Sequence, residues 1–344
     1  MAEIQNIKRF TWIDWAKTFA ISFVVFGHTP QEIGSFLQSY LVSFHMPFFM
    51  FISGYLTKKE YFCTDTLKKY WHTLIIPYFC FNILFYPYWI FRHAIENPHT
   101  GVYDYLKPII GTFMFQVNTD YFESLNGVTW FIIALIIYKI ILSLCNRIKY
   151  GYIIIVFLVL LSAVLFVLNE FNLYTKELTF IGIMRCMPFF FIGYYFRHKN
   201  IISVKPHQYD WFSSLIFLCI SLLAYQFLNT NSLITFALKF WIVSMSATIG
   251  IFSLCKLLDS CHSTIIENIS IGTIVIMGLH FILIGSTNFA LEKLLHLDNK
   301  IIYPWYVALL LCVLFEAILY PLIILFKTKY PFVLGKSSLQ KHPL

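Results

Sequence analysis

Three ionisable side chains in the apolar segment WIDWAKTFAISFVVFGH, residues 12–28, are the first candidates for chemistry. Eleven residues separate Lys17 from His28, which is close to three full helical turns, so both lie on one face of a helix, roughly 16 Å apart. Asp14 lies one turn before Lys17, where a carboxylate and an ammonium can pair. His28 is suited to take a proton from an attacking hydroxyl near neutral pH.

A purely structural interpretation of these residues remains open. A lone Lys or His near the end of a membrane helix often extends its polar tip to the interface and has no other role. The alignment of three ionisable groups on one face favours function, because such groups are costly in hydrocarbon and usually face the interior of a helix bundle.

The segment SFHMPFFMFISGYL contributes further candidates. His45 precedes Pro47, which is expected to kink the helix and to free a backbone carbonyl. Ser53, Gly54 and Tyr55 form a patch of the kind that lets neighbouring helices approach closely, and packing is the commoner role of such patches. We retain His45, Ser53 and Tyr55 as candidate binding residues.

Two basic features could contact a substrate. Lys69 and His72 lie one turn apart in KKYWHTLIIPY, where they could hold a phosphate-bearing donor, although positive charge is also typical of cytoplasmic loops. Arg185 falls within an apolar run and is a pocket candidate, because a buried guanidinium needs a partner. The connection 93–127 is rich in aromatic and acidic residues, which suit either sugar binding or a membrane interface.

The composition shows what kind of protein must position these groups. Of 344 residues, 59% are hydrophobic and 12% are charged, against about 25% charged in an average soluble domain. Apolar runs of about 20 residues recur along the chain, and each is long enough to cross a bilayer. These runs are 11–30, 34–56, 72–92, 128–146, 151–169, 178–196, 211–229, 233–256, 270–290 and 303–326. The sequence therefore predicts an all-α, polytopic integral membrane protein with about ten transmembrane helices in a single domain, 1–344.

Lys and Arg are concentrated in alternate connections, which predicts that both termini are cytoplasmic. We expect the first span to be retained as a helix and not removed as a signal peptide. The net charge of +8 follows from this asymmetry, so nucleic-acid binding need not be invoked. Zinc-ligand spacings, a Walker loop and a GxGxxG fingerprint are all missing from the sequence, so we expect no metal site, no bound cofactor and no nucleotide-driven pump.

The motifs WIDWAKTFAISFVVFGH, FHMPFFMFISGYL, KKYWHTLIIPY, GVTWFIIAL and ISIGTIVIMGLHFIL resemble, in order and spacing, the integral membrane acyltransferase 3 family. The chain is most similar to the short forms grouped with fucose 4-O-acetylases. This resemblance implies about ten membrane helices, acyl-CoA (usually acetyl-CoA) as co-substrate, and a sugar hydroxyl of a surface polysaccharide or related glycan as acceptor. It also implies a multi-pass protein of the bacterial cytoplasmic membrane, in contact with lipid.

The resemblance implies roles for individual residues. His28 matches the histidine taken as the catalytic base, and Trp130 with Phe131 matches a Trp-Phe pair of the acyl or substrate pocket. Lys17 and His72 stand where many members carry arginine, so the bidentate contacts of a guanidinium are missing at these positions. No extracytoplasmic SGNH-type domain is expected after the last span, unlike in the longer members.

Two other classes of protein remain open from the residues alone. A proton-coupled secondary transporter or glycan flippase could use Asp14, Lys17 and His28 as a proton relay. A non-catalytic assembly subunit would tolerate replacement of His28. Transfer of an acyl group from acyl-CoA by the protein would separate the enzyme from both alternatives.

Overall fold

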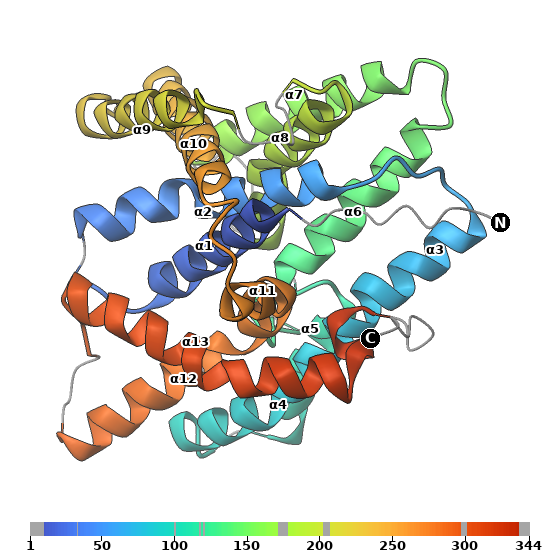
Figure 1. The fold of residues 1–344 in the computed structure, drawn as a ribbon. Coiled ribbons are helices and arrows are strands. Elements are labelled where there is room, and N and C mark those ends of the chain that lie inside the picture. The colour runs from blue at the N-terminus through green and yellow to red at the C-terminus, as the bar shows by residue number, and fades with distance from the viewer. Residues whose placement is uncertain are drawn as a thin grey trace.

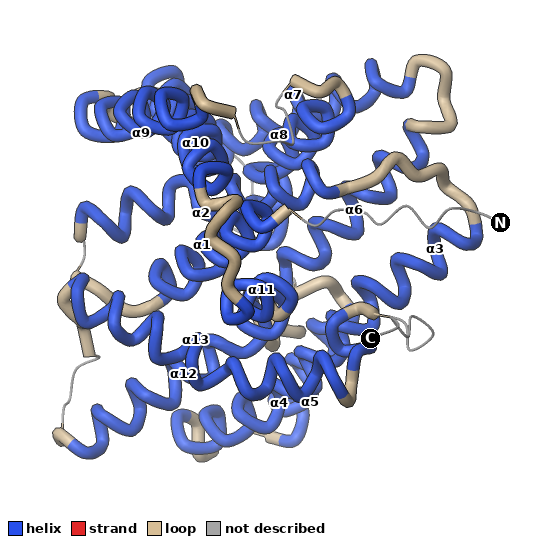
Figure 2. Tube along the Cα trace, in the orientation of Figure 1, coloured by secondary structure: helices blue, strands red, loops and turns tan. Residues whose placement is uncertain are grey.

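Helices make up almost all of the regular structure in the computed structural model (Figure 2). The structure describes residues 10–32, 34–99, 101–116, 118–119, 121–170, 178–201, 207–296 and 301–336. Within these ranges the only β contact is an isolated bridge between Gln31 and Tyr303.

The long helices follow the predicted apolar runs closely. In chain order the elements are α1 Thr11–His28, α2 Phe36–Leu56, α3 Thr64–Tyr70, the π-helix η1 Trp71–Ile75, α4 Ile76–Glu96, α5 Val102–Phe113, the 3₁₀ turn η2 Gly127–Thr129, α6 Trp130–Cys145, α7 Gly151–Glu170, α8 Leu178–His198, α9 Asp210–Phe227, α10 Leu233–Leu257, α11 Thr264–Ile271, α12 Thr273–Leu294, α13 Trp305–Thr328 and the 3₁₀ turn η3 Pro331–Leu334. The shorter α3, α5 and α11 lie in segments predicted as connections. Nine of the described helical segments are long and apolar enough to cross a membrane. The predicted first span, α1, is not among the nine, because Asp14, Lys17 and His28 lower its hydropathy.

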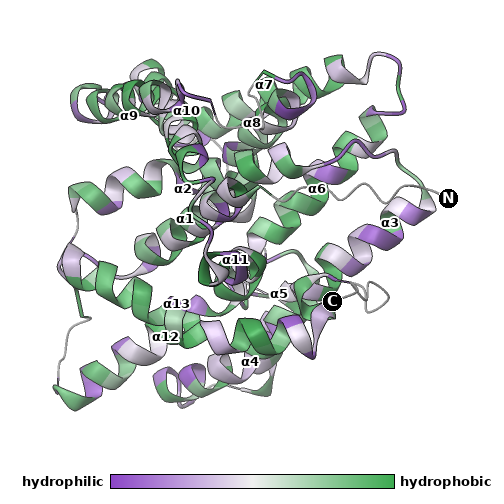
Figure 3. Ribbon diagram, viewed as in Figure 1, coloured by the Kyte–Doolittle hydropathy of each residue, from purple (hydrophilic) through white to green (hydrophobic). Residues whose placement is uncertain are grey.

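The distribution of apolar side chains fits a membrane protein. Hydrophobic residues cover most helices, and hydrophilic ones gather on α3 and on the connections (Figure 3). On α7, the side chains of Ile153, Val156 and Phe157 are exposed, as expected of residues that face lipid. The chain is therefore an all-α, polytopic membrane protein.

Helices α2 and α8 cross at very short range. A Cβ atom on Gly54 would lie 1.9 Å from the backbone oxygen of Phe190, and one on Gly193 would lie 2.1 Å from that of Phe51. Only glycine fits at either position, so the small-residue patch around Gly54 serves helix packing. Because the crossing fixes α2 against α8, it sets the relative positions of His45 and Arg185.

Helices α1 and α13 run antiparallel (Figure 1). At one end, Ser270 of α11 donates a 2.6 Å hydrogen bond to Asp14, near the start of α1, and Lys327, near the end of α13, also bonds to α11. At the other end, the backbone N–H of Tyr303 donates to the oxygen of Pro30 at 3.0 Å. The first described helix thus begins, and the last membrane helix ends, at the same end of the bundle. We call this the inner end, following the predicted cytoplasmic placement of both termini.

Candidate active site

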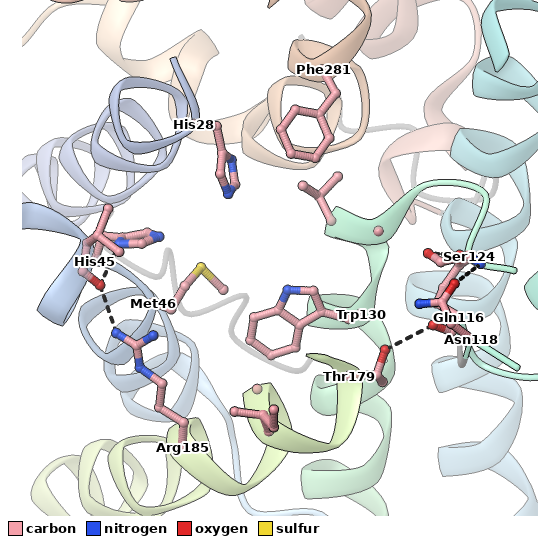
Figure 4. Close-up of a pocket in the computed structure, with 15 residues that line it drawn as sticks. His28, His45, Met46, Gln116, Asn118, Ser124, Trp130, Thr179, Arg185 and Phe281 are labelled. Carbon is pink, nitrogen blue, oxygen red and sulfur yellow. Dashed lines mark hydrogen bonds between the residues drawn. The ribbon is translucent and has the colours of Figure 1, made fainter. Parts of the chain in front are cut away.

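Five helices surround a cavity of about 480 Å³ that lies toward the outer end of the bundle (Figure 4). Helices α1, α2, α6, α8 and α12 contribute side chains to it, and so does the segment between α5 and η2. Four residues singled out from the sequence meet there: His28, His45, Trp130 and Arg185. Residues from four different helices therefore converge on one space.

His28 is the last residue of α1, and Thr29 after it has an extended backbone, so the imidazole stands at the mouth of the bundle. Its Nδ1 lies 2.8 Å from Nε2 of His280, whose own Nδ1 lies 2.8 Å from the oxygen of Ile276. A carbonyl only accepts, so Nδ1 of His280 carries hydrogen and its Nε2 accepts from Nδ1 of His28. The remaining nitrogen of neutral His28, Nε2, then holds a lone pair and can act as a base.

Sequence reasoning did not single out His280 as a site residue, although the residue lay within a quoted motif. A histidine inside the apolar helix α12 was the available signal, because ionisable groups in spans usually have a role. Helical periodicity could not show which side chain it meets, since its partner lies 252 residues away.

Pro47 shapes the second wall of the cavity. Lacking an N–H, it cannot bond to the carbonyl of Ser43, and that oxygen instead accepts from Nη2 of Arg185 at 3.0 Å and from Oγ of Ser244 at 2.9 Å. Nη2 of Arg185 also donates to the oxygen of Val42 at 2.7 Å. The expected freed carbonyl is present, and it fixes the arginine.

Arg185 brings positive charge to the cavity. Apart from the histidines, it is the only ionisable residue among the described residues that line the space. Its Nε is buried and has no hydrogen-bond partner in the described part of the chain. A guanidinium that is held by neutral carbonyls and lines the cavity can stabilise negative charge that develops there.

His45 is oriented by its own helix. Its Nδ1 lies 3.2 Å from the oxygen of Leu41 and 3.1 Å from that of Val42, so Nδ1 carries hydrogen. The ring centroid lies 6.3 Å from that of His28, nearly perpendicular to it. The cavity thus holds two imidazoles with a defined tautomer.

The outer connection closes the cavity with amide and hydroxyl groups. Gln116 adopts a left-handed backbone, φ 61°, and its Oε1 accepts from Ser124 Oγ at 2.8 Å and from Leu125 N at 2.9 Å. Of the acidic residues expected here to suit a sugar, Glu96 pairs with Arg92 and Asp104 with Lys107. Asp120 lies outside the described residues, and Glu123 is not among the residues that line the cavity.

A smaller cavity of about 180 Å³ lies on the inner side of the first, between α1, α2, α6 and α12. It is lined by Lys17 and Ser53, and by apolar side chains that include Phe131. These are the helices that carry His28, His45, Trp130 and Phe281 into the outer cavity. The two spaces therefore follow one another along the same helices, with Lys17 in the inner one and His28 in the outer one.

The remaining candidates lie elsewhere. Asp14 bonds to Ser270, and Tyr55 is 2% exposed within an aromatic cluster that contains Trp12 and Phe252. Lys69 and His72 lie in the continuous helix α3–η1 at the inner end and line neither cavity.

Lys69 forms an ion pair with Glu60, which also accepts from the hydroxyl of Tyr70 at 2.8 Å. Burial alone would raise the pKa of Glu60, but the bonds from Lys69 and Tyr70 outweigh it and hold the pKa below its usual value. The structure thus gives Lys69 an acidic partner that helical spacing did not predict.

Comparison with known families decides the class of protein. A family model described as an acyltransferase domain, that of the acyltransferase 3 family, matches residues 10–326. The chain belongs to the acyltransferase 3 family. Neither the curated proteins nor the solved structures contain a match.

The cavity of this membrane acyltransferase contains side chains of the kinds that acyl transfer can use. His28 offers a lone pair for a proton, and His280 accepts a hydrogen bond that would stabilise the imidazolium. The positive charge of Arg185, which lines the cavity, can stabilise a developing oxyanion. The acyltransferase 3 chain brings these groups together from α1, α12 and α8.

Proposed function

We propose that this membrane acyltransferase moves an acyl group, most simply acetyl, from acyl-CoA to a sugar hydroxyl of a surface polysaccharide or related glycan. The observation that carries the proposal is the hydrogen-bonded chain from Ile276 through His280 to His28, which leaves Nε2 of His28 as a base in the cavity. The setting we propose is the bacterial cytoplasmic membrane.

In the proposed reaction, Nε2 of His28 removes the proton of the acceptor hydroxyl while its oxygen attacks the thioester carbonyl. The C–S bond then breaks, and the CoA thiolate leaves and takes up the proton from the imidazolium. The products are an O-acyl sugar and CoA thiol, so atoms and charge balance. His280 stabilises the imidazolium in the interval through its bond to Nδ1.

Two side chains can donate hydrogen bonds to the oxygens of the reactants. The guanidinium residue Arg185 lines the cavity, and the indole of Trp130 faces the same space as the imidazole of His28 (Figure 4). A donor aimed at an oxygen that becomes negative during attack lowers the barrier by a few kcal/mol, about 2.7–4 for a single oxyanion-hole bond.

The acyl donor, acyl-CoA, is proposed to reach the outer cavity from the inner end of the bundle. Lys17 lines the inner cavity, and an acyl group carried on an extended arm would pass it on the way to His28. Lys69 and His72, on the inner segment α3–η1, are the proposed contacts for the phosphates of CoA. Acyl-CoA is a co-substrate in this scheme, and the reaction requires no other group.

The test is transfer of radiolabel from acetyl-CoA to the glycan fraction by membranes that contain the wild type, His28→Ala or Lys329→Gln. Lys329 is an exposed cation just after α13 and serves as a control for expression. Label is expected with the wild type and the control, and mass spectrometry of the product identifies the acceptor. Equal labelling with folded His28→Ala contradicts the proposal, and proton-coupled glycan flux without labelling would indicate a transporter.

A further inference from the structure

A third cavity, separate from the active site, lies at the inner ends of α6, α7 and α8. Its volume is about 510 Å³. Basic side chains are the common feature of its lining: Lys59, Arg147, Lys149, His198 and Lys199. The described residues that line it include neither Asp nor Glu. The cavity therefore concentrates positive charge that no lining carboxylate offsets.

Three segments carry these cations, and hydrogen bonds join them. The side-chain amide of Asn146, in the turn between α6 and α7, donates to the oxygen of Glu60 at 2.8 Å. Nε2 of His198, at the end of α8, lies 3.2 Å from the oxygen of Thr57 in the same connection after α2. These two bonds from side chains to backbone oxygens hold the three basic segments together, and like charges held near one another are unfavourable unless an anion joins them.

The first turn of α7 adds a second feature that attracts anions. A Cβ atom on Gly151 would lie 1.9 Å from the oxygen of Cys145, so only glycine allows α7 to begin this close to the end of α6. Helix α7 starts at this glycine and runs for 20 residues. Gly151 and Tyr152 line the cavity, so the positive end of the α7 helix dipole lies there and favours an anion.

Membrane depth identifies the source of the phosphate. Tyr150 and Tyr152, at the start of α7, are 56% and 55% exposed, as is typical of tyrosines at a membrane interface. One turn further on, Val156 and Phe157 are exposed and apolar. A lipid whose headgroup occupies the cavity could lay its chains along this face of α7.

The core between this cavity and the active site is filled along α6 and α8, so the cavity does not open directly toward His28. Along α6 and α8, the core between the two cavities contains the side chains of Tyr138, Phe190 and Phe191, which are at most 1% exposed. The ring centroids of Tyr138 and Phe190 lie 5.2 Å apart, so no extended arm passes between them. We propose that the cavity binds the headgroup phosphate of an anionic phospholipid from the inner leaflet.

Native mass spectrometry of the purified full-length protein tests the proposal. We expect the wild type to retain phosphatidylglycerol in preference to phosphatidylcholine. Arg147→Gln together with Lys149→Gln should weaken phosphatidylglycerol binding by about five-fold for each charge removed, the usual contribution of one basic residue near an anionic surface. Lys329→Gln, which removes an inner cation outside the cavity, should bind as the wild type does. If the double variant does not fold, Lys199→Gln replaces it.

Added solutes separate the sources of phosphate. Millimolar inorganic phosphate should displace phosphatidylglycerol only weakly, and acetyl-CoA should not displace it, because the acyl chains add affinity that neither solute has. Equal retention of the two lipids by the wild type overturns the proposal, as does equal weakening in Lys329→Gln. Displacement by acetyl-CoA that the double variant abolishes also overturns it, in favour of a nucleotide site. The experiment measures lipid binding and not acyl transfer, so its outcome does not depend on the proposed function.

Discussion

Nδ1 of His28 lies 2.8 Å from Nε2 of His280, and the two imidazole rings are nearly parallel, with 11° between their planes. The bond from His280 to the oxygen of Ile276 fixes the tautomer of both rings. Of the two histidines, only His28 lines the outer cavity, so His280 is a positioning residue.

We therefore expect His280→Phe to lower kcat roughly hundred-fold or more, the scale of general-base catalysis, because His28 loses the acceptor that orients it. The KM for acyl-CoA should stay near that of the wild type, since the donor does not contact His280 in the proposed reaction. His280→Gln, which keeps an acceptor oxygen, should retain intermediate activity. Steady-state kinetics on folded protein measures both constants, and an unchanged kcat in His280→Phe would refute the role.

Replacement of Lys17 should affect binding of the acyl donor and not that of the acceptor. Lys17→Ala should raise the KM for acyl-CoA about ten-fold or more, the value of a lost charge-assisted hydrogen bond, and should change the KM for the acceptor little. Lys17→Arg should restore much of the donor affinity, because it keeps the charge. If the dependence on acyl-CoA is the same in Lys17→Ala and the wild type, Lys17 has no part in donor binding.

The long helices were predictable from the sequence because each apolar run is long enough to span a bilayer, and these helices begin and end close to the predicted bounds. The shorter helices α3, α5 and α11 lie outside the predicted runs and were not predicted. His28, His45 and Arg185 were also predicted as site residues, since ionisable groups stand out in an apolar chain, and Trp130 was expected from the family resemblance. That these four line one cavity follows from the packing of α1, α2, α6 and α8, which no single helix encodes.

Other contacts depend on the tertiary structure and had no local signal. The bond between His28 and His280 joins helices at opposite ends of the chain, and periodicity reveals the face of a helix but not its neighbour. Gln116 enters the cavity wall through a left-handed backbone, which a non-glycine residue rarely adopts. The ion pair of Lys69 with Glu60 spans nine residues across a turn, beyond the reach of helical spacing rules.

Gly182 offers a test of the position of Trp130. A Cβ atom there would lie 2.7–2.9 Å from three carbons of the indole, so Gly182→Ala must displace the ring. We expect kcat/KM for the acceptor to fall by ten-fold or more, because misplacement by about 1 Å can cost roughly a hundred-fold in rate. Initial rates at varied acceptor concentration and fixed acetyl-CoA, for the wild type and the variant, measure this change in kcat/KM.

Gly127→Ala is the matched control, since its Cβ would meet only Ser124 Oγ at 3.7 Å, an ordinary contact in the same cavity. Its kinetics should resemble those of the wild type. Gly193→Ala should act differently, by lowering the yield of folded protein, because its Cβ would meet the backbone of α2. Equal kinetic losses in Gly182→Ala and Gly127→Ala would contradict the prediction, because the loss would then not require contact between the new Cβ atom and the indole of Trp130.

Glu60 makes the inner end sensitive to acid. Its pKa is lower in the folded protein than in the unfolded chain, because Lys69 and Tyr70 stabilise the carboxylate more than burial penalises it. The resulting stabilisation is present above the unfolded pKa, about 4.3, and is lost as the pH falls through the folded pKa. As the pH falls from the unfolded pKa through the folded pKa of Glu60, we expect the melting temperature of the wild type to decrease more steeply than that of Glu60→Gln.

Asp65→Asn, a neutralisation of an exposed carboxylate in α3, should leave the steep dependence intact. Parallel pH profiles for the wild type and Glu60→Gln would mean that the ion pair contributes nothing to stability.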